Sequence, residues 1–150
     1  MSRATVEAGL EALLAAVSGF SAAQVSTEDY TVLNRGVSKA IVIERGGTTE
    51  STVAFSGGFN VRYRFGLALF ERYQDPATTA DALATDGELV KQRLRQYTKL
   101  NGVSGVLDSV VTGERVDVDP PPELVGDPNL WRSSIIDIEV WELNATQHAE

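Results

Sequence analysis

Residues Asn60 to Phe70, which read NVRYRFGLALF, contain the clearest alternation of apolar and polar side chains in the chain. Successive side chains of a β-strand point to opposite faces, so odd-numbered and even-numbered positions occupy different faces. The even positions include Arg62, Arg64, Gly66 and Ala68. The stretch therefore predicts a long central strand with one face in a hydrophobic core, formed by Val61, Tyr63, Phe65, Leu67 and Leu69.

Shorter β-rich stretches precede this strand. Lys39 to Arg45 contains a β-branched run, which predicts a strand that ends at Gly46-Gly47. Thr52 to Phe55 predicts a further short strand before a turn at Gly57-Gly58. The stretch Phe20 to Gly36 has no clear period, and we expect it to be mostly loop. Within that stretch, Tyr30 to Leu33 is a candidate short strand.

Two more β-regions follow the central strand. Val103 to Val111 and Glu114 to Val118 predict strands or a hairpin around Thr112-Gly113. Ser133 to Leu143 alternates again, with Ile136, Ile138 and Val140 on its inner face. Residues 144–150 are expected to form a disordered tail.

Proline interrupts the pattern between these two β-regions. Pro120, Pro121 and Pro122 cannot donate hydrogen bonds inside a sheet, and they predict a surface loop from Asp119 to Asn129.

Two segments show helical spacing of apolar residues. Thr5 to Ser18 predicts a helix, with Leu10 and Leu14 among its inward positions and Gly19 as its C-terminal cap. Pro76 fits the first turn of a second helix, which ends at Asn101-Gly102. Together these elements predict one α+β domain over residues 1–150. Its single mixed or antiparallel sheet is packed by an N-terminal helix and a central helix.

Composition narrows the classes of function. The chain has 21 acidic and 13 basic residues and a net charge of -8, which argues against capture by nucleic acid or an anionic membrane. It has no cysteine, so disulfides and thiol chemistry are absent. The N-terminus lacks the charged and apolar regions of a signal peptide. No apolar run reaches the roughly 20 residues that a membrane span needs. We expect a protein partner.

No residue pattern indicates catalysis. The single histidine, His148, lies at the C-terminus, where a side chain is poorly held against a nucleophile. Asp137 and Glu139 alternate along the last strand and place two carboxylates on one face, about 6 to 7 Å apart. This pair suits either a cation site or a charged face that keeps the strand soluble, and the second interpretation is favoured. We expect a non-enzyme without cofactor or metal.

Charged and aromatic residues suggest contact surfaces instead. Arg62, Arg64 and Arg72 form a basic stripe, and Asp137 and Glu139 lie in an acidic C-terminal region. This asymmetry is compatible with a head-to-tail contact between subunits, but a solvated outer face is the favoured explanation of the stripe. Trp131 and Trp141 flank the last strand. They are either exposed interface anchors or covered by the second helix or the proline-rich loop.

The order of these elements resembles the tail terminator, or tail completion, proteins of long-tailed bacteriophages. The resemblance is carried by the N-terminal helix, the strand NVRYRFGLALF at 60–70, the second helix and the closing strand WRSSIIDIEVW at 131–141. It covers nearly the whole chain, and related neck proteins share much of the pattern. The stretch Ala77 to Gly87 departs from it by lengthening the approach to the second helix.

The resemblance implies a subunit of a ring, commonly a hexamer, at the end of the tail tube. Such a ring stops tube polymerisation and presents a surface to the head connector, in a virion assembled in the host cytoplasm. Implied partners are further copies of the chain, the tail tube protein and the head connector protein. The contact regions expected are Arg62 with Arg64, Asp137 with Glu139, and the loop from Asp119 to Asn129.

Two other classes remain open from the sequence. One is another head-tail connector or a tail-tube subunit, which would form tubes or bind shells. The other is an intracellular metal- or small-molecule-binding domain that uses Asp137, Glu139 and Glu142.

Overall fold

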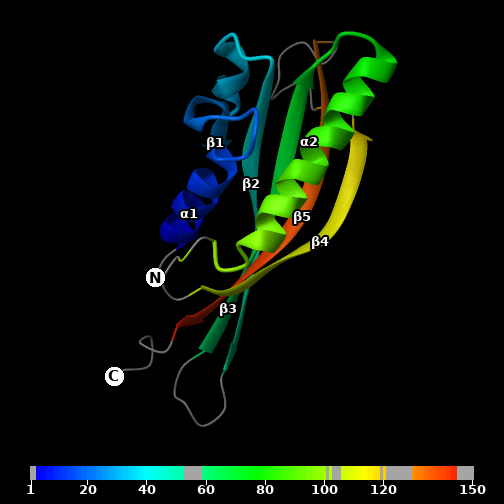
Figure 1. Ribbon diagram of the computed structural model, residues 1–150. Helices are drawn as coiled ribbons and strands as arrows, with labels where there is room; N and C mark the ends of the chain where they lie inside the picture. Colours follow the sequence, from blue (N-terminus) through cyan, green and yellow to red (C-terminus); the bar gives the residue numbers. More distant parts are fainter. Residues whose placement is uncertain are drawn as a thin grey trace.

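The computed structural model describes residues 3–52, 59–100, 102, 106–118, 120 and 130–144. Within these ranges, five strands form one mixed sheet in the order β1-β2-β3-β5-β4, and two α-helices lie against it (Figure 1). The predicted α+β fold, with one sheet and an N-terminal and a central helix, is confirmed. The elements are α1 (Arg3–Ala15), β1 (Val25–Thr27), β2 (Lys39–Thr52), β3 (Phe59–Arg72), α2 (Pro76–Gln96), β4 (Val106–Val118) and β5 (Trp131–Asn144).

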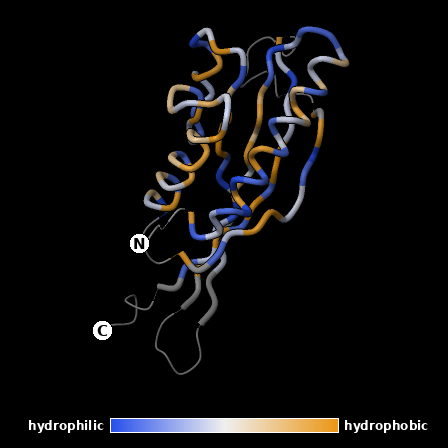
Figure 2. The backbone as a smooth tube through the Cα atoms, in the orientation of Figure 1, coloured by the Kyte–Doolittle hydropathy of each residue, from blue (hydrophilic) through white to orange (hydrophobic). Residues whose placement is uncertain are grey.

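The alternating strand lies at the centre of the sheet, as its pattern predicts. β3 pairs antiparallel with β2 on one side and with β5 on the other, and Leu67 is aligned with Ile43 and Ile136. Its odd-numbered side chains from Val61 to Leu69 are all buried. Apolar residues line the layer between the sheet and the helices (Figure 2). The core therefore forms on one face of β3 because of its two-residue period.

Both α-helices cover this first face of the sheet (Figure 1). α1 inserts Val6, Leu10, Leu13 and Leu14, and α2 inserts Leu83, Val90 and Leu94. α2 starts at Pro76 because the Asp75 carboxylate caps it, accepting a hydrogen bond of 2.8 Å from the Thr78 amide. Neither described α-helix combines the length and apolar character that crossing a membrane requires.

Gly46-Gly47 does not end the second strand, so that prediction is wrong. β2 continues to Thr52, and its pairing with β3 shifts register between Arg45 and Thr48. A Cβ atom on Gly46 would lie 2.9 Å from the Arg64 carbonyl oxygen. The glycines thus allow a β-bulge in which the two backbones approach closely. The expected strand at Thr52 to Phe55 and the turn at Gly57-Gly58 lie outside the described residues, apart from Thr52.

Of the two alternatives predicted for this region, strands or a hairpin, the hairpin around Thr112-Gly113 is wrong, whereas the strand character is correct over Val106–Val118. β4 is one strand that runs antiparallel to β5 and shifts register three times, once between Val111 and Gly113. Each extra residue reverses the side-chain parity, which explains why the sequence alternation is poor there. The bulges also protect this edge strand against pairing with another chain.

The stretch Phe20 to Gly36 contains more structure than predicted. It forms a short 3-10 helix at Ala22–Gln24, then β1, which pairs parallel with β2, then a second 3-10 helix, η2, at Tyr30–Asn34. The expected strand at Tyr30 to Leu33 is therefore helical. Asp29 caps this turn by accepting a hydrogen bond of 3.0 Å from the Thr31 amide. Such short elements carry too few residues for a period to be visible.

Candidate functional site

The second face of the sheet, opposite α1 and α2, is covered over only part of its length. At one end, η2 packs Val32 and Leu33 against a small second core. This core contains Ala40, Val42, Ala68, Phe70 and Trp131. Beyond it, no described helix packs on this face. We call the remaining part the open half-face, formed by Glu44, Arg62, Arg64, Gly66, Asp108, Val110, Arg115, Asp137, Glu139 and Trp141.

The two charged stripes expected on separate surfaces lie side by side on the open half-face. Arg64 is aligned with Glu139 because β3 and β5 are neighbours. Glu139 Oε2 lies 3.3 Å from Arg62 Nε and 3.9 Å from Arg64 Nε. One carboxylate oxygen thus forms ion pairs with two guanidinium groups. The geometry is not that of a hydrogen bond, and neither Arg62 Nε nor Glu139 Oε2 has a hydrogen-bond partner among the described residues. The stripe and the acidic strand therefore form one surface of mixed charge.

The tryptophans of β5 have different environments. Trp131 is 2% exposed and packs edge-on against Phe70, with ring centroids 6.5 Å apart. Arg72, the third basic residue of the predicted stripe, stacks over Trp131 at 4.8 Å. Trp131 is therefore a core residue of this chain and not an exposed anchor. The second core and η2 cover it, whereas α2 packs on the other face of the sheet. Trp141 is half-buried, and Arg62 stacks over it at 4.0 Å.

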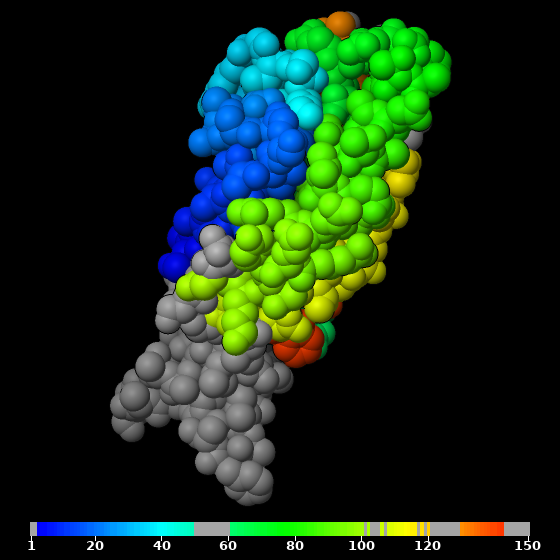
Figure 3. All heavy atoms as spheres, viewed as in Figure 1, coloured from blue at the N-terminus to red at the C-terminus, as the bar shows by residue number. Residues whose placement is uncertain are grey.

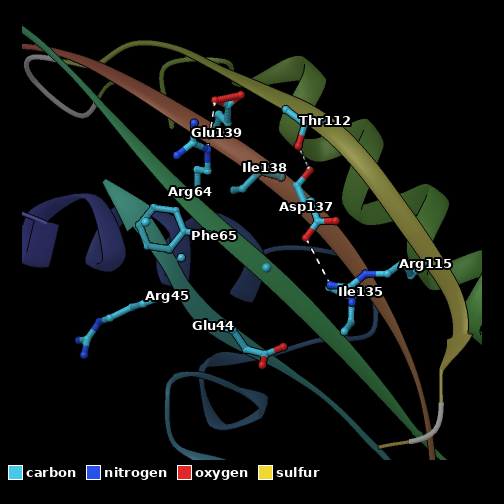
Figure 4. A pocket seen from close by; sticks show the side chains of 13 residues that line it. Glu44, Arg45, Arg64, Phe65, Thr112, Arg115, Ile135, Asp137, Ile138 and Glu139 are labelled. Carbon is cyan, nitrogen blue, oxygen red and sulfur yellow. Dashed lines mark hydrogen bonds and ion pairs between the residues drawn. The ribbon is translucent and has the colours of Figure 1, made fainter. Parts of the chain in front are cut away.

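A hollow of about 460 Å³ lies over Gly66 in the open half-face. Figure 4 shows Glu44 on one side of it, with Asp137 and Arg115 on the other. Arg115 reaches Asp137 at 3.6 Å, and the Thr112 hydroxyl donates to the Asp137 carbonyl oxygen at 3.2 Å. Gly66 forms part of the floor, where a Cβ would make ordinary van der Waals contacts with the side chains of Ile135 and Glu44.

Sequence reasoning missed four members of this surface: Glu44, Asp108, Val110 and Arg115. Glu44 lies next to the bulge, and β4 loses its alternation at bulges, so parity alone does not place these side chains. Glu44 also faces Tyr30 of η2. Burial and the neighbouring Glu44 carboxylate raise the pKa of the Tyr30 hydroxyl well above its usual value. Tyr30 and Glu44 thus mark the border between the covered and open parts of this face.

The three carboxylates considered for a cation site are not brought together. Asp137 and Glu139 lie on the open half-face beside arginines, whereas Glu142 lies on the first face and is fully buried. The Tyr63 hydroxyl donates to Glu142 Oε1 at 3.3 Å. Among the described residues, no group of three histidine, cysteine or acidic side chains is arranged to hold a metal.

A second titratable cluster joins α2 to the ends of β2 and β3 on the first face. The Lys39 ammonium lies 3.2 Å from Oδ1 of the buried Asp86, and Lys39 is aligned with Glu71 across the β2-β3 ladder. Burial, together with the adjoining Asp86 carboxyl, raises the pKa of Glu71 to about 8. One lysine therefore balances two carboxyl groups at this junction.

This cluster predicts a pH dependence of stability. Glu71 ionises near pH 4.5 in the unfolded chain but near pH 8 in the folded chain. The contribution of Glu71 to the free energy of unfolding is therefore complete below about pH 4.5, and it falls as the pH rises to about 8. Glu71→Gln is expected to raise the free energy of unfolding by more than about 1 kcal/mol at pH 9 and to change it little at pH 4. Denaturant unfolding at both values measures this.

The matched control for Glu71→Gln is Asp81→Asn, which removes an exposed carboxylate from the same helix-covered side. We expect it to leave the stability difference between pH 4 and pH 9 unchanged. An equal gain from Glu71→Gln at both pH values would contradict the linkage.

The remaining predicted contact regions are not described by the structure. The loop from Asp119 to Asn129 lies outside the described residues apart from Pro120, which is buried. The tail prediction lies outside them for residues 145–150, whereas Asn144 ends β5.

Fold and surface together define a small α+β protein: one five-stranded sheet, helices on its first face, and a partly uncovered, charged second face among the described residues. Comparison with protein-family models finds no match, and comparison with curated protein sequences finds none either. The function is therefore argued from the surface itself.

Proposed function

We propose that this chain is a structural subunit that assembles into a ring at the head-proximal end of a bacteriophage tail tube. The ring, with six copies expected, stops tube polymerisation and provides the head-tail joining surface. Its partners are further copies of the chain, the tail tube protein and the head connector protein, and its location is the tail or neck of the virion. The element order that resembles tail terminators supports this assignment.

The open half-face is the observation that carries the proposal. It presents three arginines and four carboxylates on paired strands, so its side chains are held in a fixed pattern. Arg64 and Arg115 are about half exposed and retain guanidinium donors for a partner. Mixed, geometrically fixed charge favours specific association over simple solubility. This fits a protein whose role is contact with other subunits.

The product of assembly distinguishes a tail terminator from proteins with related virion roles. A tail-tube subunit would form long tubes, and a different connector would bind shells, whereas a terminator forms closed rings on tube ends. Electron micrographs of the purified protein mixed with tail tubes distinguish these products. Bare tube ends, together with an absence of rings, would overturn the proposal. The arginines beside Asp137 and Glu139 give the metal-binding alternative no support.

Reversing the basic stripe is expected to weaken ring formation strongly. Arg62→Glu combined with Arg64→Glu places two new carboxylates beside Glu139 and removes both guanidinium groups from the open half-face. Like charges across a contact oppose association. We expect at least a tenfold rise in the concentration needed for rings, measured by sedimentation velocity and micrographs.

The control changes net charge equally at exposed sites elsewhere: Arg35→Glu combined with Arg95→Glu. This control should assemble like the wild type. Unchanged assembly of the Arg62 and Arg64 variant, with a normal melting curve, would show that the basic stripe does not contribute to the ring contact.

A further inference from the structure

The side chains of the open half-face lie in rows that run across the strands. One row is low, because Gly66 and Gly113 are both aligned with Asp137 and carry no side chain of their own. The hollow of about 460 Å³ lies over this row and extends to the two glycines of the β2 bulge. Two carboxylates, from Glu44 and Asp137, flank the hollow at Gly66 (Figure 4). We call Gly66 and Gly113 the glycine row.

The next row along the strands stands higher. Arg64 and Val110 are both aligned with Glu139, two residues along β5 from Asp137. The Arg64 side chain is 47% exposed and Val110 is 42% exposed, whereas the Glu139 side chain between them is 17% exposed. Two protruding side chains therefore stand directly beside the glycine row, and we call Arg64 and Val110 the raised row.

A two-fold rotation between these rows fits one row into the other. When the axis lies across the strands, the raised row of each copy faces the glycine row of the other. Arg64 of one copy then enters the hollow over Gly66 of the second, between that copy's Glu44 and Asp137 carboxylates, which accept its guanidinium donors. Because a two-fold contact is the same seen from either copy, each contact occurs twice.

The outer rows obey the same rotation. On β4, Asp108 is aligned with Trp141, and Arg115 is aligned with Ile135 at the other end of the open half-face. The rotation places Asp108 of each copy over Arg115 of the other, and both residues are exposed. It also places Trp141 over Ile135, which adds an apolar contact beside these ion pairs.

The geometry points to a face-to-face dimer in which the open half-faces of two copies of this chain cover each other about a two-fold axis. The inference goes beyond the proposed ring, because it concerns the free chain and needs no tail tube. Three arginines meet four carboxylates across such a contact, so the surface suits a second copy of itself better than a strongly acidic or basic partner.

One approach of like charge occurs in this arrangement, between Asp137 of one copy and Glu139 of the other. Both carboxylates already have a guanidinium partner in their own chain. Arg115 lies 3.6 Å from Asp137, and Arg62 lies 3.3 Å from Glu139. The neighbouring Arg64 of each copy adds a further positive charge at this point. The approach is therefore balanced by the arginines around it.

The position of η2 selects the direction of the axis. η2 thickens the second face at one end only. An axis along the strands would bring the η2 segments of both copies together and hold the half-faces apart. The axis across the strands places them at opposite ends, outside the contact. The first face offers no such surface, because α1 and α2 cover it (Figure 3).

Charge exchange tests the two-fold contact. Asp108→Arg and Arg115→Asp are each expected to raise the dissociation constant of the dimer about tenfold or more, because each creates two like-charged pairs across the axis. An equal mixture of the two variants should recover wild-type association, since a dimer with one copy of each restores both opposite-charge pairs. Sedimentation velocity at increasing concentration measures this. A wild-type chain that stays monomeric throughout, or a mixture without recovery, would overturn the inference.

Gly66→Leu tests the fit of the rows without changing charge. The new side chain occupies the hollow that receives Arg64, so the dissociation constant should again rise about tenfold. Ala84→Leu, which adds the same side chain on the exposed outer face of α2, is the control and should dimerise like the wild type. Normal dimerisation of Gly66→Leu, with a native circular dichroism spectrum, would contradict the arrangement.

Cysteine cross-linking of the free chain gives an independent answer, because the natural chain has no cysteine. The two copies of Val110 lie about 7 Å apart along the strand direction in the proposed dimer. Val110→Cys treated with a short bis-maleimide should therefore give covalent dimers on a denaturing gel. Ala84→Cys should give none. Equal yields from the two variants would count against the contact.

The outcomes separate this inference from the proposed function. Cross-linked dimers of the free chain, together with tail tubes that keep bare ends, would support the dimer and overturn the ring. Rings on tube ends, without dimers of the free chain at any concentration, would overturn the dimer and leave the ring function intact.

Discussion

Trp131→Ala is expected to lower the free energy of unfolding by about 3 to 5 kcal/mol. Trp131 is buried at 2% exposure in the second core, where its ring contacts Phe70 edge-on and Arg72 stacks over it. Alanine removes these contacts and leaves a cavity under η2, which holds Val32 and Leu33 on the same core. Guanidinium chloride unfolding followed by circular dichroism measures the loss.

Trp141→Ala is the matched control on the same face of β5. Trp141 is half-buried, and its main described contact is the stacked Arg62 guanidinium. A stack of this kind contributes about 0.5 to 1 kcal/mol, so we expect a much smaller loss of stability. The opposite ranking, with Trp131→Ala nearly neutral and deficient in assembly, would mean that Trp131 is an interface anchor after all.

Leu67→Ala is expected to cost about 3 kcal/mol, through the main core on the first face. Leu67 is fully buried at the centre of β3, between Ile43 of β2 and Ile136 of β5. Both neighbouring strands and the helices are packed there, so the site has little freedom to collapse around the cavity. Thermal or denaturant unfolding measures the change. Leu130→Ala, at an exposed leucine, is the control and should change stability by less than about 0.5 kcal/mol.

The two core substitutions also test whether the cores are independent. Leu67 is aligned with Ile136, five residues along β5 from Trp131, a separation of about 16 Å along the strand. Sites so far apart usually contribute additively to stability within about 0.5 kcal/mol. A double variant that loses much less than the sum would indicate that loss of one core already disrupts the other.

The fold was predictable where one pattern persists over many residues. β3 keeps a two-residue period from Val61 to Leu69, and it proves to be the centre of the sheet. α2 was recognisable from its apolar spacing and from Pro76, although its capping residue Asp75 was not noticed. Helix ends differ by two or three residues for α1, because the termini of a helix contribute little to its apolar period.

The errors fall where the backbone departs from regular geometry. Gly46-Gly47 has the composition of a turn, yet it forms a bulge because Arg64 of the neighbouring strand approaches at that point. Thr112-Gly113 is a similar case on β4. In both places, the partner strand decides the outcome, and a partner strand is not visible in local sequence.

The candidate surface was predictable only in part for the same reason. Parity placed Arg62 with Arg64, and Asp137 with Glu139, each pair on one face of its own strand. The order β3-β5-β4 then brings these pairs together and adds Arg115 and Val110. That order depends on long-range pairing between strands separated by α2, and no local pattern records it.

Tail-tube assembly in the presence of the protein tests the central claim most directly. Tube protein would be polymerised with increasing amounts of this chain, and the lengths and ends of the tubes would be counted in electron micrographs. A terminator is expected to arrest growth, so that tubes stop lengthening and carry one ring at a single end. Tubes that keep growing with bare ends, at any excess of this chain, would contradict the proposed function.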